Sequence, residues 1–311
     1  NDIGILLDSS SNNSVSGNTI TANNGYGILL DYSLNNSVSG NNITANNGYG
    51  IQLGGSSNNS IAGNNITNNR YGIRLYSSSN YNSVSGNNIT NNRYGIRLVY
   101  SSNYNSIAGN NITANNGYGI LLDSSSNNSI AGNNITANND IGILLDSSSN
   151  NSVSGNNITA NNGYGIRLRH SSNNSVSGND ITNNGGGISL SSSSNNILRS
   201  NSIVGNRANF EVWGDKLSDF INDVDASNTV DDKPIYYWIN MRDATVPHDA
   251  GCVILVNSTN ITVKELELKN NSIGVLLVYT RNTTETQNNI TNNGGGICLG
   301  SSSNNSIVGN N

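Results

Sequence analysis

The chain has 311 residues, with 14 Lys or Arg against 19 Asp or Glu, which gives a formal net charge of −5. This mild acidity, without a run of basic residues, argues against nucleic-acid binding, for which a basic stripe is expected. No apolar run approaches the roughly 18 residues of a membrane span, so we expect no transmembrane segment.

A segment of the form Gly-aliphatic-x-Leu recurs nine times between Gly4 and Leu190, with a period of 22 to 24 residues. Self-similarity at this period is typical of a solenoid, in which each unit stacks on the previous one. Within residues 26–49 the aliphatic spacing is not helical, and short alternating segments lie between Asn, Gly and Ser clusters. This pattern predicts three short strands per coil.

Stacked coils would place each strand roughly 4.8 Å from its equivalent in the next coil and would form long parallel sheets. The sequence therefore predicts an all-β, right-handed parallel β-helix, because parallel connections are almost always right-handed. Inside it we expect the column of Leu residues that includes Leu7 and Leu30. Three Asn columns, beginning at Asn13, Asn18 and Asn23, are expected at the turns, where stacked amides would hydrogen-bond from coil to coil.

The regular repeats cover residues 1–206, and a less regular coil with an aromatic-rich excursion covers residues 207–251. The pattern resumes over residues 252–311, so we expect about 13 coils in one continuous solenoid domain. Residues 214–250 hold most of the large aromatic side chains outside the Tyr-rich repeats. They are interpreted as a lateral flap packed on the helix, with a ligand-binding lobe as the alternative.

The two cysteines are expected to be free thiols. In this register Cys252 and Cys298 lie two coils apart, about 10 Å, which exceeds the Cα separation of about 7 Å that a disulfide tolerates.

The less regular region also carries a family resemblance. The segments Phe210–Gly214, Asn228–Tyr237, Val256–Thr262 and Asn271–Leu277 resemble right-handed β-helix domains of the NosD-like type, which are related to the carbohydrate-binding and sugar-hydrolase (CASH) group. This resemblance implies an extracellular, envelope-associated protein, as in surface proteins of methanogenic archaea, without a catalytic motif. A copper role does not transfer, because one Met and two scattered His form no copper-binding cluster.

A first candidate site combines arginines and tyrosines of the fourth and fifth coils. Arginine guanidinium groups beside aromatic rings suit the binding of an anionic glycan or an acidic protein surface. The alternative is that these arginines are solvated and lie beside a ladder of stacked tyrosines without binding a ligand. The residues of this patch are Arg70, Arg74, Tyr76, Tyr81, Arg93, Arg97, Tyr100 and Tyr104, together with Tyr71 and Tyr94.

A second candidate site is formed by aspartates one coil apart, Asp8 with Asp31 and Asp123 with Asp146. Like charges at this spacing repel, so each pair would need a cation or would partly protonate. Calcium at Asp123 and Asp146 is one candidate, although it takes about six to eight oxygen ligands. A glycosidase needs an acid and a base facing one sugar, and neither His nor Lys was expected beside these carboxylates. No other cofactor and no catalytic residue is expected.

Sequons suitable for glycosylation occur in nearly every coil, where neighbouring glycans would crowd each other. Outside the regular repeats, the candidates are Asn257, Asn270 and Asn282. The chain begins inside a repeat and without Met, so we expect a processed product or a piece of a longer protein.

The leading hypothesis is a non-enzymatic extracellular module of a surface layer, sheath or fibre. Both ends show full repeat sequence, and open β edges favour pairing with other copies end to end. The alternatives are a glycan-binding adhesin module that contacts cell-surface polysaccharide through the Arg/Tyr patch, and a polysaccharide lyase or hydrolase that works on the outer face of the first sheet.

Overall fold

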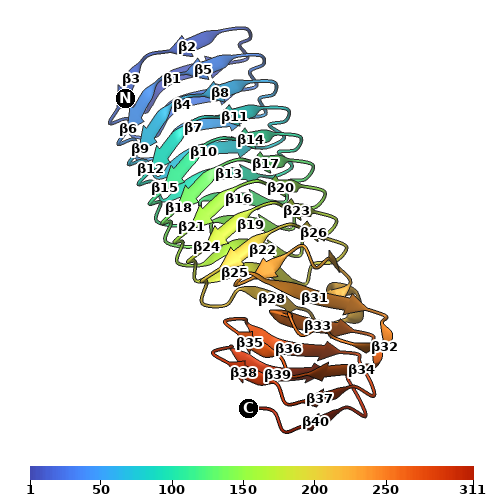
Figure 1. Cartoon of the computed structure of the whole chain (residues 1–311). Helices are drawn as coiled ribbons and strands as arrows, with labels where there is room; N and C mark the ends of the chain where they lie inside the picture. Colours follow the sequence, from blue (N-terminus) through green and yellow to red (C-terminus); the bar gives the residue numbers. More distant parts are fainter.

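The computed structural model describes all 311 residues and confirms a parallel β-helix. Most of the chain forms one long stack of coils, in which every coil contributes a strand to each of three parallel sheets, and Figure 1 shows this stack in blue to yellow. The first sheet contains β1 (Ile3–Asp8), β4 (Tyr26–Asp31), β7 (Tyr49–Gly54), β10 (Tyr71–Tyr76), β13 (Tyr94–Val99), β16 (Ile120–Asp123), β19 (Ile143–Asp146), β22 (Tyr164–Arg169), β25 (Gly186–Ser191) and β28 (Phe210–Trp213).

The other two sheets are built from shorter strands of two or three residues. The second sheet contains β2 (Ser14–Ser16), β5 (Ser37–Ser39), β8 (Ser60–Ala62), β11 (Ser83–Ser85), β14 (Ser106–Ala108), β17 (Ser129–Ala131), β20 (Ser152–Ser154), β23 (Ser175–Ser177), β26 (Ile197–Arg199) and β29 (Asp223–Val224). The third sheet begins with β3 (Thr19–Thr21), β6 (Asn42–Thr44), β9 (Asn65–Thr67), β12 (Asn88–Thr90), β15 (Asn111–Thr113), β18 (Asn134–Thr136), β21 (Asn157–Thr159), β24 (Asp180–Thr182), β27 (Ser202–Val204) and β30 (Thr229–Val230).

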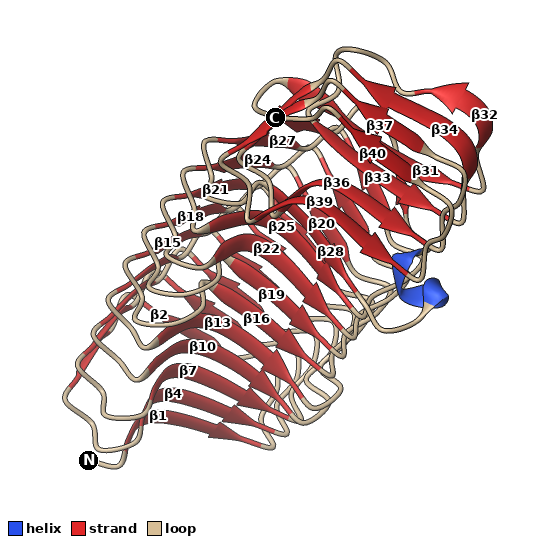
Figure 2. Cartoon of the chain, turned by 90° about the horizontal axis from the view of Figure 1, so that it is seen from below, coloured by secondary structure: helices blue, strands red, loops and turns tan.

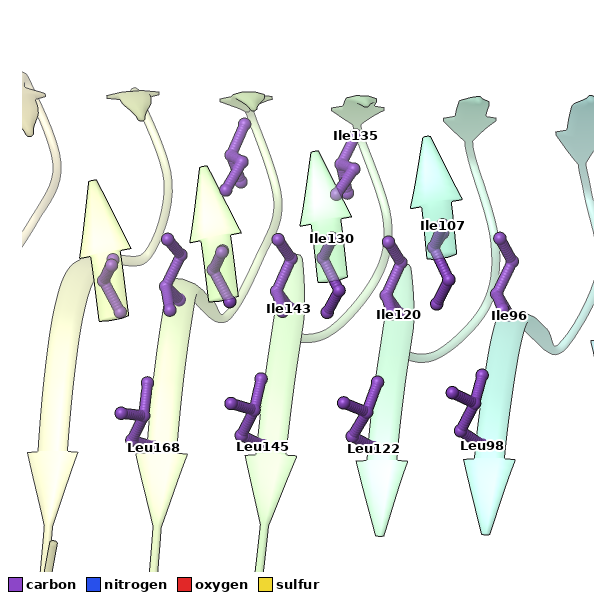
Figure 3. Packing of buried hydrophobic residues seen from close by; sticks show 14 of the residues in the cluster. Ile96, Leu98, Ile107, Ile120, Leu122, Ile130, Ile135, Ile143, Leu145 and Leu168 are labelled. Carbon is purple, nitrogen blue, oxygen red and sulfur yellow. The ribbon is translucent and has the colours of Figure 1, made fainter. Parts of the chain in front are cut away.

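The expected inner columns are confirmed. Aliphatic residues of all three sheets point into the stack, where Ile28, Leu30, Val38 and Ile43 have no exposed surface. The same positions stack coil upon coil, as Figure 3 shows for the columns that contain Ile96 and Leu98. Each coil contributes so few apolar side chains that it is stable only when its neighbours cover them.

Amide ladders connect the coils at the turns, as predicted. The side-chain oxygen of Asn133 accepts hydrogen bonds from the backbone nitrogen (3.0 Å) and the side-chain nitrogen (2.9 Å) of Asn110. The side-chain nitrogen of Asn133 in turn donates to the carbonyl oxygen of Ile107 at 3.0 Å. A fourth, unpredicted ladder consists of buried serines, in which the backbone nitrogen of Ser125 donates to the hydroxyl of Ser148 at 3.0 Å.

Residues 214–250 differ from the expected lateral flap. After β28 a single 3-10 helix (Leu217–Phe220) lies beside the stack, as Figure 2 shows, and β29 and β30 then complete a tenth coil. Asp231 and Asp232 both have positive φ, the geometry of a tight two-residue hairpin, and reverse the chain into β31 (Lys233–Ile239), which pairs antiparallel with β30. The aromatic-rich segment is therefore part of the solenoid.

A second, shorter stack follows this reversal and lies beyond the yellow end of the first stack in Figure 1, in orange to red. Its strands are β31, β32 (Arg242–Thr245), β33 (Cys252–Val256), β34 (Thr259–Lys264), β35 (Glu267–Lys269), β36 (Ile273–Val278), β37 (Thr284–Thr286), β38 (Asn289–Thr291), β39 (Gly295–Gly300) and β40 (Ser306–Val308). Of these, β31, β33, β36 and β39 continue the third sheet. Ten strands of the first sheet together with β33, β36 and β39 account for the predicted 13 or so coils, one strand for each coil.

The second stack packs against the first through the sheet that contains β33 and β36. One face of these strands, including Leu255 and Leu277, faces a separate inner core, whereas the opposite face, including Leu276, joins the core cluster of Phe210 and Phe220. A parallel sheet that is buried on both faces has continuous apolar strands, and residues 252–256 are such a run. The second stack therefore covers the inward-facing Phe210 and Val212 of the last coil and closes that end of the first stack's core.

Candidate functional site

Tyrosines form a ladder along one edge of the outer face of the first sheet. The rings of Tyr26, Tyr49, Tyr71 and Tyr94 are stacked, with successive centroids 5.3, 4.7 and 5.3 Å apart, and Tyr118 continues the ladder at 5.5 Å in a tilted arrangement. Sequence reasoning picked out two members of this ladder and missed the rest. The signal was present, because an Asn-x-Tyr-Gly sequence precedes the aliphatic segment of most coils.

Arg74 lies at the centre of this outer face and is held between aromatic rings. Its guanidinium carbon is 4.4 Å from the ring centroid of Tyr76 and 5.2 Å from that of Tyr49. One terminal nitrogen donates to the Tyr49 hydroxyl at 2.9 Å, and the buried Nε has no partner. Arg97 occupies the equivalent position on the next strand, and its Nε is also buried without a partner.

The remaining members of the predicted Arg/Tyr patch divide into two groups. Arg70 and Arg93 lie over the rings of Tyr71 and Tyr94, at 5.6 and 5.4 Å, and so belong to the same face. Tyr76 and Tyr100 meet edge to face at 5.5 Å beside them.

Tyr81 and Tyr104 do stack on each other, at 5.1 Å, as their insertions in adjacent coils predicted. They lie on a turn that leads to the second sheet, and no cation–π contact connects either ring to an arginine.

The arginines of this face have no acidic side chain near them in the sequence. No Asp or Glu occurs between Asp31 and Asp123, and this stretch contains Arg70, Arg74, Arg93 and Arg97. The nearest carboxylate in the stack is Asp123, whose oxygen is 3.7 Å from a terminal nitrogen of Arg97. The fourth and fifth coils therefore present a local cationic strip on a protein of net negative charge.

Both aspartate pairs are in register, as expected. Arginines of neighbouring coils supply the positive charge beside Asp123 and Asp146, whereas Asp8 and Asp31 form no ion pair. Asp146 lies directly beside Asp123 and forms an ion pair with Arg169. The expectation that no histidine lies nearby is wrong, because Nδ1 of His170 is 4.0 Å from an Asp146 oxygen. No three or more His, Cys, Asp or Glu side chains are arranged so that they could hold a metal ion.

The three glycosylation candidates lie in or beside the second stack. Asn257 and Asn282 are exposed, and the Asn257 amide donates to Asn240 at 2.7 Å. Asn270 is half-buried, and its amide donates to Asp231 at 2.8 Å. The two cysteines are free, as predicted.

Comparison with known proteins supports the fold and identifies the family. Residues 77–234, just over half of the chain, match the family described as periplasmic copper-binding protein (NosD). Residues 1–112 match a right-handed β-helix region, in agreement with the expected hand. No curated protein matches the sequence. No helix of the structure has the length and apolar character needed to cross a membrane.

Among solved structures, the chain is similar to the Dettilon tailspike protein, with 16% identity and a TM-score of 0.54 over 93% of this chain and 61% of that one. It is also similar to a tailspike mutant of E. coli bacteriophage HK620, with 13% identity and a TM-score of 0.56 over 89% and 59%. A third similar structure is the AlgE6 A-module, a mannuronan C-5 epimerase of Azotobacter vinelandii, with 13% identity and a TM-score of 0.52 over 96% and 90%. The chain thus spans about three fifths of either tailspike.

These comparisons correct the leading expectation from the sequence. A structural module that builds a surface layer, sheath or fibre is wrong, because the proteins of similar fold are tailspikes and a mannuronan epimerase. The glycan-directed alternatives fit these findings better. The archaeal origin implied by the resemblance finds no support among them.

The copper in the family description does not fit the donor atoms of this chain. Copper sites use His, Met and Cys side chains gathered around one ion, but no such group is present. Cys252 is buried, and burial raises the pKa of its thiol to about 12, which disfavours the thiolate that a metal needs. The chain nevertheless belongs to the NosD family, because it forms a β-helix and matches that family over more than half of its 311 residues.

Proposed function

We propose that this protein binds an anionic polysaccharide outside the cytoplasm, along the outer face of its first sheet. The observation that carries this proposal is the cationic strip of Arg70, Arg74, Arg93 and Arg97 beside the tyrosine ladder, in a stretch of chain without acidic residues. The periplasmic description of the family supports a location beyond the cytoplasm, and extracellular or cell-surface exposure is the more specific form of the proposal.

The geometry of the strip suits a linear, charged polymer. Guanidinium groups bind carboxylate or sulfate through paired, charge-assisted hydrogen bonds, and the exposed Arg70 and Arg93 form no ion pair within the protein. The ring contacts hold Arg74 in place, so less side-chain freedom is lost on binding. Because equivalent side chains recur roughly every 4.8 Å along the stack, a polymer lying along the axis can contact several coils at once.

The observations favour binding over catalysis. The carboxylates of Asp123 and Asp146 point from adjacent strands and are engaged by Arg97 and Arg169. A hydrolase of this type needs two carboxyl groups on opposite sides of one sugar, with one of them protonated. The similarity to tailspikes and an epimerase supports a glycan ligand at the level of the fold.

Retention on immobilised polyuronate tests the proposal. The variant Arg74→Ala with Arg97→Ala should bind at least about tenfold more weakly than the wild type, because two charge-assisted contacts are lost. Arg242→Ala with Arg281→Ala removes the same charge from exposed positions of the second stack and is the matched control. It should retain nearly wild-type binding, and wild-type retention should fall as salt is added. Equal losses in both double variants, or equal retention on a neutral polysaccharide, would reject the proposal.

A further inference from the structure

A polar cleft lies where the two stacks meet. The sequence Asn-Asn-Gly-Gly-Gly occurs twice, over residues 183–187 in the first stack and 292–296 in the second, and residues of both copies line this cleft. Its volume is about 570 Å³, and its lining includes Gly185 from one copy and Gly294 from the other. The side chains that line it are Asn162, Tyr164, Arg207, Ser272, Asn292 and Asn293. Sites between two structural units are a common location for ligand binding.

Glycine keeps this cleft open at the end of the tyrosine ladder. Gly186 stands in the register position that Tyr164 occupies on the preceding strand, and a Cβ at Gly186 would collide with the Tyr164 ring. The ring therefore lies over the glycine backbone. In the second stack, a Cβ at Gly294 would lie 2.8 Å from the carbonyl oxygen of Ser272. Larger residues at Gly186 or Gly294 would displace the cleft walls.

Glu211 holds two of the lining residues, Tyr164 and Ser272, and so connects the two stacks beside the cleft. One of its oxygens accepts hydrogen bonds from the Tyr164 hydroxyl at 2.8 Å and the Ser189 hydroxyl at 2.7 Å. Its other oxygen accepts one from the hydroxyl of Ser272, in the second stack, at 3.2 Å. Burial, reinforced by Glu211, raises the pKa of Tyr164 to about 12, so the phenol remains a hydrogen-bond donor. The position of the aromatic ring is therefore set before any ligand binds.

Several polar groups of the cleft have no partner within the protein. Arg207 is exposed and makes neither an ion pair nor a side-chain hydrogen bond. The amide of Asn292 makes no hydrogen bond, and that of Asn162 donates to Asn139 but leaves its own oxygen free. The guanidinium of Arg167, 5.5 Å from the centroid of the Tyr164 ring, adds a second positive charge nearby.

We propose that this cleft binds one terminal uronic acid residue, at an end of the anionic chain that lies along the outer face. Arg207 would pair with its carboxylate, the Tyr164 ring would pack against the sugar, and the Asn162 and Asn292 amides would contact its hydroxyls. The inference rests on the proposed function, because the outer face ends at this point. The first sheet ends at β28, and Ser272 of the second stack contacts Glu211 there, so the row of equivalent strands that the polymer would follow stops at this point.

Short oligouronates separate this site from the central strip. Binding of an oligogalacturonate trimer, measured by calorimetry on the full chain, should weaken about tenfold in Arg207→Gln and more in Arg207→Glu, because the ion pair is lost or reversed. Arg242→Gln, at an exposed position of the second stack, is the control and should bind as the wild type does. These titrations are made in the Arg74→Ala with Arg97→Ala background, in which the central strip no longer competes for the trimer and polymer retention is lost.

Each result has a distinct meaning. Trimer binding that survives Arg207→Glu, or a neutral trimer that binds equally well, would overturn the cleft assignment. If the wild type retains polymer but does not bind the trimer, the cleft assignment fails alone and the central strip stands. If the trimer binds but the polymer is not retained, the proposed function fails and the cleft remains as a site for free uronates. Circular dichroism of each variant verifies that the fold is intact.

Discussion

Replacing Glu285 is expected to change the pH dependence of the stability of the second stack. This residue lies on β37 in an inward column, between Val263 of the preceding coil and Ile307 of the following one. Its side chain is fully buried, and neither carboxyl oxygen has a hydrogen-bond partner. A buried, unpaired carboxylate is strongly disfavoured, so folding favours the protonated form.

The magnitude follows from the pKa. Burial raises the pKa of Glu285 from 4.5 to about 7. Below about pH 4.5 the group is protonated in both the folded and the unfolded chain and costs nothing in ionisation. Between about pH 4.5 and 7 the unfolded chain releases the proton first, so stability falls as pH rises. Above that range the cost levels off at roughly 3 kcal/mol, since one pKa unit corresponds to about 1.4 kcal/mol.

Urea unfolding of the wild type, Glu285→Gln and Glu285→Val at about pH 4.5 and 8.5 measures this effect. Glu285→Gln removes the titration and keeps the size, whereas Glu285→Val matches the aliphatic column at Val263. The stability of both variants relative to the wild type should rise by roughly 3 kcal/mol from the acidic to the alkaline condition. Exposed Glu265→Gln is the control and should show no such rise. A constant offset between variants and wild type at both pH values would refute the reasoning.

Two further predictions concern the ladders and the thiols. Asn133→Ala should destabilise the protein by about 3 kcal/mol in thermal or urea unfolding, because it leaves buried donors of Asn110 unpaired. Asn134→Ala, on the adjacent exposed rung, should cost less than about 1 kcal/mol, and equal losses would contradict the ladder's role. With a thiol reagent, half-buried Cys298 should react in the native protein, whereas buried Cys252 should react only after unfolding. Fast modification of both thiols in the native state would contradict this assignment.

Much of the fold could be read from the sequence because its main interactions repeat with the period of the chain. A residue such as Leu30 meets its equivalents one coil before and one coil after, and the same holds for Asn133 and its neighbours in the ladder. The second stack was not predicted. Its signal was the unbroken apolar run of residues 252–256, which indicates a strand buried on both faces rather than on one.

The candidate site was predicted in part. Reading outward positions beside the Leu column correctly placed Arg74 and Arg97 on neighbouring strands of one face. The ion-pair partners of the charged side chains could not be predicted from the sequence, because side-chain conformation decides whether Arg97 reaches Asp123 or Arg169 reaches Asp146. The same limitation explains why His170 was not placed beside Asp146.

By itself, the sequence determined a stack of three-stranded coils with aliphatic residues inside and asparagine at the turns. It could do so because every coil must satisfy its hydrogen bonds and bury its apolar side chains against a copy of the same pattern. Only the tertiary structure decided the contacts that do not follow the period. The hairpin at Asp231 and Asp232 reverses the chain, and the resulting second stack brings Ser272 to Glu211 and closes the glycine-lined cleft. Such contacts depend on the direction in which one turn sends the chain, which no repeated pattern records.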